Sequence, residues 1–428
     1  MRLSAAAARL PAIVAACGIV PLLALTLVRA VDIPFGDEWE WADLIYGAHQ
    51  HSLTFAQLWA PHNEHRIFIP ALIALALDAV AGWSVVREQL ISLAFLGLTQ
   101  LALWGLIRRT VPVGRRGVCF LVASALLLGL VQYENLYWGF QIAWFLVDLC
   151  AVVALLQLTR PHGGPQELSF AIALATIAGL SSAQGLLVWP AGLVAIALIP
   201  RDRLPRLAAW LLAGIAVTAA VRWGGPATGA GYVALSHLDV IARYVLVYLG
   251  SPLALSFGLQ TAALRGALAI AWTAAIVVFA LRAPLAARVR LAPWLALAAY
   301  ALLCALATAA ARAGFGVEQA LAPRYTTIAE LIWVAAFAAT CIVIPRGTAL
   351  RFGLVAGVAA MLLAATVHQS YAGDLAWRLH AIALRDAGRL LDVGDPRAFV
   401  VLYPYPDRVQ VLLGELARIH DGVFSRAR

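Results

Sequence analysis

Long apolar runs, separated by short arginine-bearing loops, constrain this chain more than any other feature. A helix needs about 20 apolar residues to cross a bilayer core of roughly 30 Å. Inside that core each span must satisfy its own backbone hydrogen bonds, which favours helices. The sequence therefore predicts an all-α integral membrane protein with about eleven transmembrane helices, at approximately 10–31, 86–107, 117–133, 140–158, 168–183, 185–200, 207–223, 264–281, 291–311, 326–344 and 351–370.

The composition excludes the other broad classes. Of the 428 residues, 63% are hydrophobic and 12% are charged, and the mean hydropathy is +0.86. Ordinary soluble domains carry about 25% charged residues, and disordered chains are poor in apolar residues. The net charge of +9 comes from arginines scattered between apolar runs. Because they form no basic stripe with interleaved aromatic residues, no nucleic-acid partner is expected.

The arginines also predict an orientation in the membrane. With the N-terminus in the cytoplasm, the arginine-rich connections at 108–116, 159–164, 201–206, 282–290 and 345–351 all face the cytoplasm. The acids on that side are Glu167 and Asp202 alone. This distribution agrees with the positive-inside rule. An odd number of spans then places the C-terminal tail outside the cytoplasm.

Two segments outside the spans, 32–85 and 224–263, are predicted as long outer loops of a transmembrane bundle covering 1–370. Within the first, 68–83 is apolar but has only sixteen residues and contains Asp78. A crossing there would invert every later loop, so we expect a helix that lies at the outer interface or re-enters from it. The tail, 371–428, is predicted as a small α/β-like cap with a helix over 374–392, a strand over 398–403 and a helix over 407–420.

The first outer loop concentrates the ionisable residues of a chain that has few of them. Ionisable groups beside a membrane often mark function, although an ordinary polar interfacial helix, with tryptophans at the lipid headgroups, explains the same pattern. The residues concerned are Asp32, Asp37, Glu38, Glu40, Asp43, His49, His51, His62, Glu64 and His65, with Trp39, Trp41 and Trp59 among them.

An Asp-Glu pair, Asp37 and Glu38, stands just after the first span in PFGDEWEW. A carboxylate partly desolvated by Trp39 and Trp41 can have the raised pKa of a useful general base. We expect Asp37 to be that base and Glu38 to orient an acceptor or bind a cation. The same pair can cap a helix beginning near Trp39, and the two roles are compatible.

Three outer-face arginines are candidates for binding a phosphate leaving group. Arg324, in APRYTT, is the first choice, Arg312 the second and Arg243 the third. A guanidinium can hold a phosphate through two hydrogen bonds. Pairing with Glu318, or contact with lipid headgroups, is the alternative explanation.

Further residues are candidates for binding a cation, the sugar or the acceptor. Glu64, His62 and His65 suggest a divalent cation, the one cofactor the sequence raises, although HxxH in a loop is not the helical pair of a metalloprotease. No nucleotide-binding glycine loop occurs, so a nucleotide donor is not expected. Contacts to the acceptor, the sugar or a cation are predicted for Asn63, Glu64, His65, Arg66, Glu134 and Gln184.

A first span, an outer loop with an Asp-Glu pair, a short amphipathic helix, a polar cluster and a near-spanning apolar helix resemble the GT-C membrane glycosyltransferases. That superfamily includes the protein O-mannosyltransferases and the lipid A aminoarabinose transferases. The Asp-Glu motif falls on Asp37 and Glu38, and the second polar patch on 63–66. The resemblance is best over the first hundred residues.

The resemblance implies an inverting transfer of a sugar from a polyprenyl-phosphate donor to a glycan, lipid or protein acceptor. It places the reaction at the outer face of a bacterial inner membrane. The sequence departs from the family in two ways, since its second patch reads Glu-His-Arg and its outer C-terminal part is small. Both departures leave the acceptor open.

Two other function classes stay open. A lipid or polysaccharide transporter or flippase is expected to carry polar residues near the bilayer midplane and two related halves. Another membrane transferase, such as an acyltransferase or an O-antigen-ligase-like enzyme, would place its site in a late loop such as 312–324.

Overall fold

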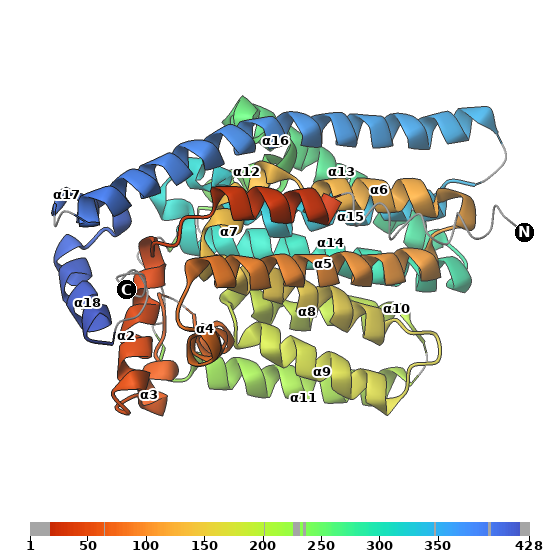
Figure 1. The fold of residues 1–428 in the computed structure, drawn as a ribbon. Coiled ribbons are helices and arrows are strands. Elements are labelled where there is room, and N and C mark those ends of the chain that lie inside the picture. Colours follow the sequence, from red (N-terminus) through yellow and green to blue (C-terminus); the bar gives the residue numbers. More distant parts are fainter. Residues whose placement is uncertain are drawn as a thin grey trace, which may run out of the picture.

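The computed structural model describes residues 18–63, 65–200, 202–225, 232–233, 237–345, 348–392 and 395–419. Long helices run side by side as a bundle, and short helices gather at one end of it (Figure 1). Within the described ranges the only β-pairing is an isolated bridge between His62 and His65. The long-helix part consists of an apolar helix at Gly18–Arg29 followed by α5 (Val85–Thr110), α6 (Arg116–Leu127), α7 (Tyr133–Tyr137), α8 (Ile142–Leu158), α9 (Pro165–Gly179), α10 (Val188–Leu198), α11 (Arg203–Arg222), α12 (Leu238–Ala254), α13 (Leu259–Arg282), α14 (Leu285–Arg312), α15 (Thr326–Val343) and α16 (Ala349–Asp392).

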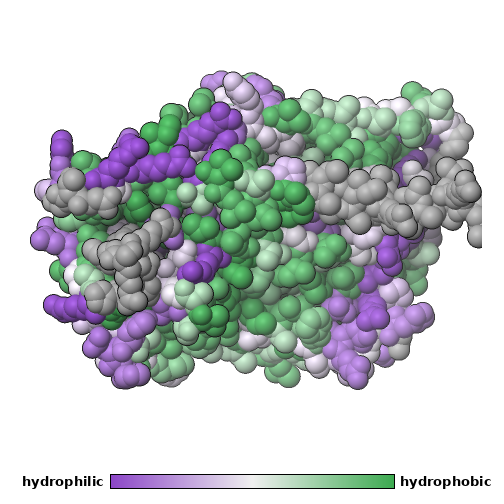
Figure 2. Space-filling model, viewed as in Figure 1, coloured by the Kyte–Doolittle hydropathy of each residue, from purple (hydrophilic) through white to green (hydrophobic). Residues whose placement is uncertain are grey.

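The surface of the bundle is apolar where lipid would lie. Figure 2 shows hydrophobic residues across the middle of the visible face and hydrophilic residues towards its two ends. Helices α11 and α13 bury only 17% and 22% of their most apolar windows inside the protein. Water-soluble proteins rarely expose apolar surface on this scale. The fold is that of a multi-pass, all-α membrane protein.

The number of helices that can cross differs from the predicted eleven. Among the described residues, nine helical segments are long and apolar enough. Three predicted windows contain shorter helices instead: Gly18–Arg29, whose window begins outside the described residues, α9, and Ala183–Leu198. A tight turn shortens the last two, because a Cβ at Gly185 would overlap the Ala178 carbonyl oxygen.

One candidate span, Leu238–Phe257, lies in the predicted second outer loop. Its main helix, α12, belongs to the buried interior of the bundle, with Tyr244, Tyr248 and Leu249 fully buried. Two glycines allow α12 to pack this closely against α13. A Cβ at Gly250 of α12 would overlap a carbonyl oxygen of α13, and a Cβ at Gly266 of α13 would overlap a carbonyl oxygen of α12. The predicted outer segment 224–263 thus contains a helix, as expected, but α12 packs inside the bundle instead of lying on its surface.

Short helices close one end of the bundle, and a pocket lies at that end. They are η1 (Gly36–Glu38), α2 (Trp39–His49), α3 (Phe55–Leu58), α4 (Phe68–Ala81), α17 (Arg397–Leu402) and α18 (Pro406–Ile419). Helix α4 is seen end-on in Figure 1, so it runs crosswise to the long helices beside it. Its Asp78 is buried and lies 3.0 Å from Nε2 of His49 in α2. This crosswise course is the one expected of a helix at an interface.

The sequence suggested that Trp39 and Trp41 lie at the lipid headgroups, but the structure places them elsewhere. Both are buried in a second hydrophobic cluster, where α2 meets Val409 and Leu412 of α18. At the edge of that contact Tyr403 Oη donates to Glu40 Oε1 at 2.7 Å. The C-terminal cap thus folds onto the first loop.

The predicted strand of the cap is wrong, because residues 397–402 form α17. Asp395, which precedes the N-cap Pro396, accepts the backbone N–H of Arg397 at 2.9 Å at the start of this helix. The short run Phe-Val-Val favours a strand only weakly, because strand preference depends on the surrounding packing. The predicted boundary at 370 also falls inside one continuous helix, α16. No proline interrupts α16 there, and Gly373 lets it pass close to the Leu130 carbonyl.

Candidate active site

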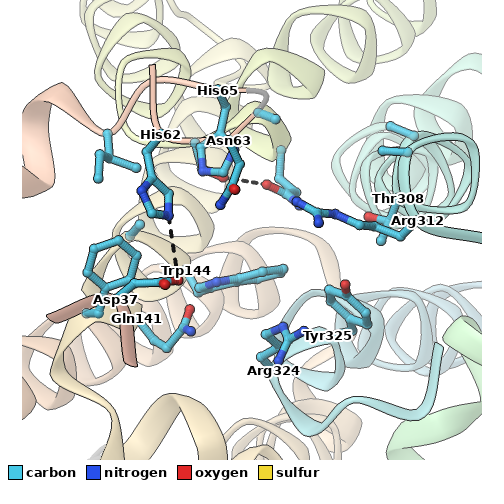
Figure 3. Close-up of a pocket in the computed structure, with 18 of the residues that line it drawn as sticks. Asp37, His62, Asn63, His65, Gln141, Trp144, Thr308, Arg312, Arg324 and Tyr325 are labelled. Carbon is cyan, nitrogen blue, oxygen red and sulfur yellow. Dashed lines mark hydrogen bonds and ion pairs between the residues drawn. The ribbon is translucent and has the colours of Figure 1, made fainter. Parts of the chain in front are cut away.

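A cavity of about 260 Å³ lies at the closed end of the bundle, between segments that are far apart in the sequence. Asp37 and His62 stand on one side and Arg312 on another, with Arg324 and Tyr325 below them in the view of Figure 3. The structure thus brings together seven of the residues singled out in the sequence: Asp37, His62, Asn63, His65, Gln184, Arg312 and Arg324. The remaining candidates lie elsewhere or outside the described residues.

Asp37 is presented to the pocket by a sharply bent segment. Gly36 has a φ of +57°, and a Cβ there would stand 2.7 Å from the Trp138 ring. Glycine tolerates both the backbone angle and the close approach. The Trp138 indole N–H also donates to the Phe35 carbonyl at 2.8 Å. Asp37 keeps 36% of its side chain exposed, and its Oδ2 lies 3.6 Å from Nε2 of His62.

Glu38 does not face the pocket, contrary to the expected role at the acceptor or a cation. It is 1% exposed and accepts the backbone N–H groups of Phe35 at 2.7 Å and Phe140 at 3.3 Å. Burial, followed by the neighbouring Glu88, raises the pKa of Glu38 well above its usual value. Its carboxyl group holds the Asp37 segment against the residues preceding α8.

The histidine pair forms one wall through a tight turn. The His62 N–H donates to the His65 carbonyl at 2.7 Å, and the His65 N–H returns the bond at 3.2 Å. Asn63 takes a φ of +51° within this turn, a conformation that asparagine adopts more readily than most residues. Burial, then His62 and Arg312, lowers the pKa of His65 to about 3. His65 is therefore neutral at physiological pH.

The sequence named His62, Glu64 and His65 of this wall as candidate ligands of a divalent cation. Among the residues that the structure describes, no three His, Cys, Asp or Glu side chains are grouped as metal ligands. His62 is engaged by Asp37, and Glu64 lies outside the described residues. No step of the chemistry below depends on a metal.

Arg324 is held in the pocket by two polar residues of α7. Its Nη1 lies 3.2 Å from Glu134 Oε2, and 28% of its side chain is exposed. Asn135 donates from Nδ2 to the Arg324 carbonyl at 2.8 Å and to Thr327 Oγ1 at 2.6 Å. Glu134, predicted to touch the sugar or acceptor, does not line the cavity and instead positions Arg324.

Arg312 reaches the same cavity from the last turn of α14. Its guanidinium carbon lies 5.8 Å from the centre of the Phe315 ring. The cavity therefore has a carboxylate on one side and two guanidinium groups elsewhere on its wall. Such an arrangement can accept a proton at one point and bind an oxyanion at another.

Two predicted arginines point away from the pocket. Arg66 is 3% exposed and donates to the backbone carbonyls of Trp59, Val221 and Trp223, so it ties the first loop to the end of α11. Arg243 is exposed on α12 and does not line the cavity. A buried guanidinium needs acceptors, and Arg66 finds them in backbone rather than in a ligand.

Several lining residues were missed by the sequence reasoning. Gln141 comes from the turn just before α8, Trp144 from the first turn of α8, Thr308 from α14 and Tyr325 from the turn before α15. Gln141 offered one usable signal, a polar side chain at the edge of an apolar span and three residues from a tryptophan. The others resemble ordinary span residues until the helices pack.

Comparison with known proteins adds no relative: no protein-family model matches the chain, and no curated protein matches its sequence.

Proposed function

We propose that this chain is a membrane glycosyltransferase that moves a sugar from a polyprenyl-phosphate donor to an acceptor. The observation that carries the proposal is the pocket itself. Asp37 lines one side of it, and Arg312 and Arg324 line it as well, although the three residues are far apart in the sequence. In a chain with 12% charged residues, this convergence calls for a chemical role.

The size of the cavity suits the proposed donor. Pockets that enclose drug-sized ligands measure roughly 300–1,000 Å³, and this one measures about 260 Å³. A single sugar ring with part of its phosphate is a reasonable occupant, while the isoprenoid chain stays in lipid. The aromatic wall, with Trp144 and Tyr325, suits the apolar face of a sugar ring.

The proposed reaction is a single displacement. The acceptor hydroxyl oxygen forms a bond to the anomeric carbon as the bond from that carbon to the phosphate oxygen breaks. Asp37 takes the hydroxyl proton, and the phosphate leaves with its electron pair on the carrier lipid. Arg312 and Arg324 stabilise the negative charge that develops on the phosphate. One displacement inverts the configuration at the anomeric carbon.

We place this pocket at the outer face of a bacterial inner membrane, with the N-terminus in the cytoplasm and the C-terminal cap outside. The arginine-rich connections, such as 282–290 before α14, lie at the end of each long helix opposite to the pocket residues. The positive-inside rule then assigns that opposite end to the cytoplasm. The crosswise α4 lies at the pocket end, where a donor headgroup would enter from lipid.

The direct test is transfer by the purified full chain from synthetic polyprenyl-phosphate sugars, with and without a chelator. Asp37→Asn keeps the size of the side chain and removes the base, so transfer is expected to fall by at least about 100-fold. Asp43→Asn is the matched control, since Asp43 is an acid of the same loop that pairs with Arg408 on the surface. Full activity in Asp37→Asn would refute the assignment.

A transporter or flippase is the second candidate, and one observation favours it. Asp148 of α8 and Glu330 of α15 are 4% and 1% exposed, inside the bundle rather than at its end. Buried acids in membrane helices often mark a transport path. Lipid-flipping measurements in proteoliposomes decide between the two functions, because a flippase moves fluorescent polyprenyl phosphate without making a glycoside.

A further inference from the structure

Two buried carboxyl groups meet beneath the segment that carries Asp37. Glu38 comes from η1 and Glu88 from the first turn of α5, and each is 1% exposed. Both press against Gly139: a Cβ there would stand 2.6 Å from Glu88 Oε2 and 3.0 Å from Glu38 Oε1. Both carboxyl groups therefore contact Gly139, which has no side chain to displace them, and Glu88 is close enough to act electrostatically on Glu38.

The carboxyl groups of Glu38 and Glu88 differ in their hydrogen-bond partners. Glu38 uses its oxygens to accept the N–H groups of Phe35 and Phe140, as described above. Glu88 Oε1 accepts the Trp83 indole N–H at 3.0 Å, whereas its buried Oε2 has no hydrogen-bond partner. The unpartnered oxygen is the one that lies against Gly139, on the side of Glu38.

The titratable groups that the structure describes around this pair include a third acid, a tyrosine and a histidine. Asp32, from the start of the loop, acts on Glu88 as a second acid and is itself held by the Ser84 hydroxyl at 2.9 Å. Tyr137 of α7 faces Glu38, and the His380 ring of α16 stacks on Tyr137 with 3.7 Å between ring centres. Burial raises the pKa of Glu38, and the proximity of Glu88 raises it further.

Two ionised carboxylates at this separation and burial repel strongly. One proton shared between them removes the repulsion and gives the free Glu88 oxygen a hydrogen bond. The carboxyl group of Glu38 can then keep its bonds to Phe35, two residues before Asp37, and to Phe140, just before α8. The shared proton therefore helps to hold the segment that carries Asp37.

We propose that Glu38 and Glu88 hold one proton between them, and that this proton positions Asp37 in the pocket. Glu88 is then a positioning residue, and it was not among the residues predicted from the sequence. Loss of the proton leaves two charges against Gly139 and loosens the bonds to Phe35 and Phe140. The link to catalysis rests on the proposed transferase function. The shared proton and the positioning of residues 35–38 are independent of that function.

Infrared difference spectroscopy of the full chain in detergent tests the shared proton. Raising the pH should remove a protonated-carboxyl band in the wild type, and the pH at which this band is lost should change in both Glu88→Gln and Glu38→Gln. Asp78→Asn is the control, since Asp78 is a buried acid outside the pair and bonded to His49. An unchanged alkaline band loss in both Gln variants would overturn the proposal.

Amide hydrogen exchange tests the positioning without any assay of transfer. Glu88→Gln retains a permanent donor toward Glu38, so the segment 35–38 should exchange at the wild-type rate at neutral pH and stay protected at alkaline pH, where the wild type loses protection about tenfold. Glu88→Ala should exchange faster at every pH. Equal exchange of 35–38 in the wild type, Glu88→Gln and Glu88→Ala overturns the positioning role.

The pH dependence of transfer separates this inference from the proposed function. The alkaline limb of kcat should move up by about one pH unit in Glu88→Gln, with the acceptor KM unchanged. A wild type without transfer activity, together with the expected infrared and exchange results, overturns the transferase and leaves the pair standing. An active wild type whose alkaline limb coincides with that of Glu88→Gln overturns the link between the pair and Asp37.

Discussion

Nε2 of His62 lies 3.6 Å from Oδ2 of Asp37, across the wall of the pocket. The two residues come from different parts of the first loop, and the turn that carries His62 is closed by its own backbone bonds to His65. The imidazole lies next to a carboxylate that keeps 36% of its side chain exposed, so it can orient that carboxylate. His62 is therefore expected to orient the proposed base.

Replacing His62 with glutamine should lower kcat for transfer by about tenfold, a smaller loss than that of Asp37→Asn, because the base remains but is less well oriented. The donor KM should stay within about twofold. Steady-state kinetics on purified protein measure both quantities. His49→Gln, which removes the other His-Asp pair of the loop, serves as control. Equal losses for the two histidine variants would contradict the orienting role.

The Glu134–Arg324 pair predicts a specific effect on the donor. Glu134→Gln removes the charge that holds the guanidinium, so the donor KM is expected to rise several-fold while the acceptor KM is unchanged. Arg324→Lys should raise the donor KM by about tenfold or more, since an ammonium cannot make the paired hydrogen bonds of a guanidinium. Arg243→Lys, on the exposed face of α12, should behave as wild type.

Asn135 supports the turn that carries Arg324, so its loss should destabilise the protein itself. Asn135→Ala removes two hydrogen bonds at a fully buried position and leaves the Arg324 carbonyl without that donor. The expected cost is about 1–3 kcal/mol, seen as a lower thermal unfolding midpoint in detergent. Gln166→Ala, which removes an exposed amide of α9, should leave the midpoint unchanged. A wild-type midpoint for Asn135→Ala would show that the turn is held by other contacts.

The lowered pKa of His65 predicts a pH dependence of stability. In the folded protein this pKa is about 3, against 6.5 for an unperturbed histidine. Between those values the unfolded chain binds a proton that the folded chain does not, so stability falls as the pH drops below 6.5, by at most about 1.4 kcal/mol per pH unit.

His65→Gln should flatten this dependence. Thermal midpoints of the wild type and the variant at pH 7.5, 6 and 5 give the comparison, and the difference between the two proteins should grow in favour of the variant as the pH falls. Parallel curves would mean that His65 takes up its proton equally in both states.

The apolar runs were sufficient to predict an all-α membrane protein, because the local composition of a segment determines whether it can lie in lipid. Local composition could not predict which helices are broken or buried. The turn at Gly185 shortens two predicted spans, and the glycines of α12 and α13 draw α12 into the interior. These outcomes depend on close contacts between helices, which no single window of sequence contains.

The candidate site was likewise predictable from the sequence only in part. Asp37, Arg312 and Arg324 could be chosen from the sequence because charged residues are rare in this chain, and their position next to spans made each one conspicuous. Their convergence on one cavity was decided by the packing of the first loop against α14 and the turn before α15. Glu134 and Arg66 were chosen for the same reason, but tertiary contacts give them supporting roles.

The sequence by itself determined where the chain meets lipid and where its few charges stand, since both follow from side-chain chemistry along the chain. Only the tertiary structure decided that Glu38 turns inward to Glu88 while its neighbour Asp37 turns to the pocket. The physical reason is that the direction of a side chain depends on what packs beside it. In this protein those neighbours, Trp138 and Gly139, come from about 100 residues further along the chain.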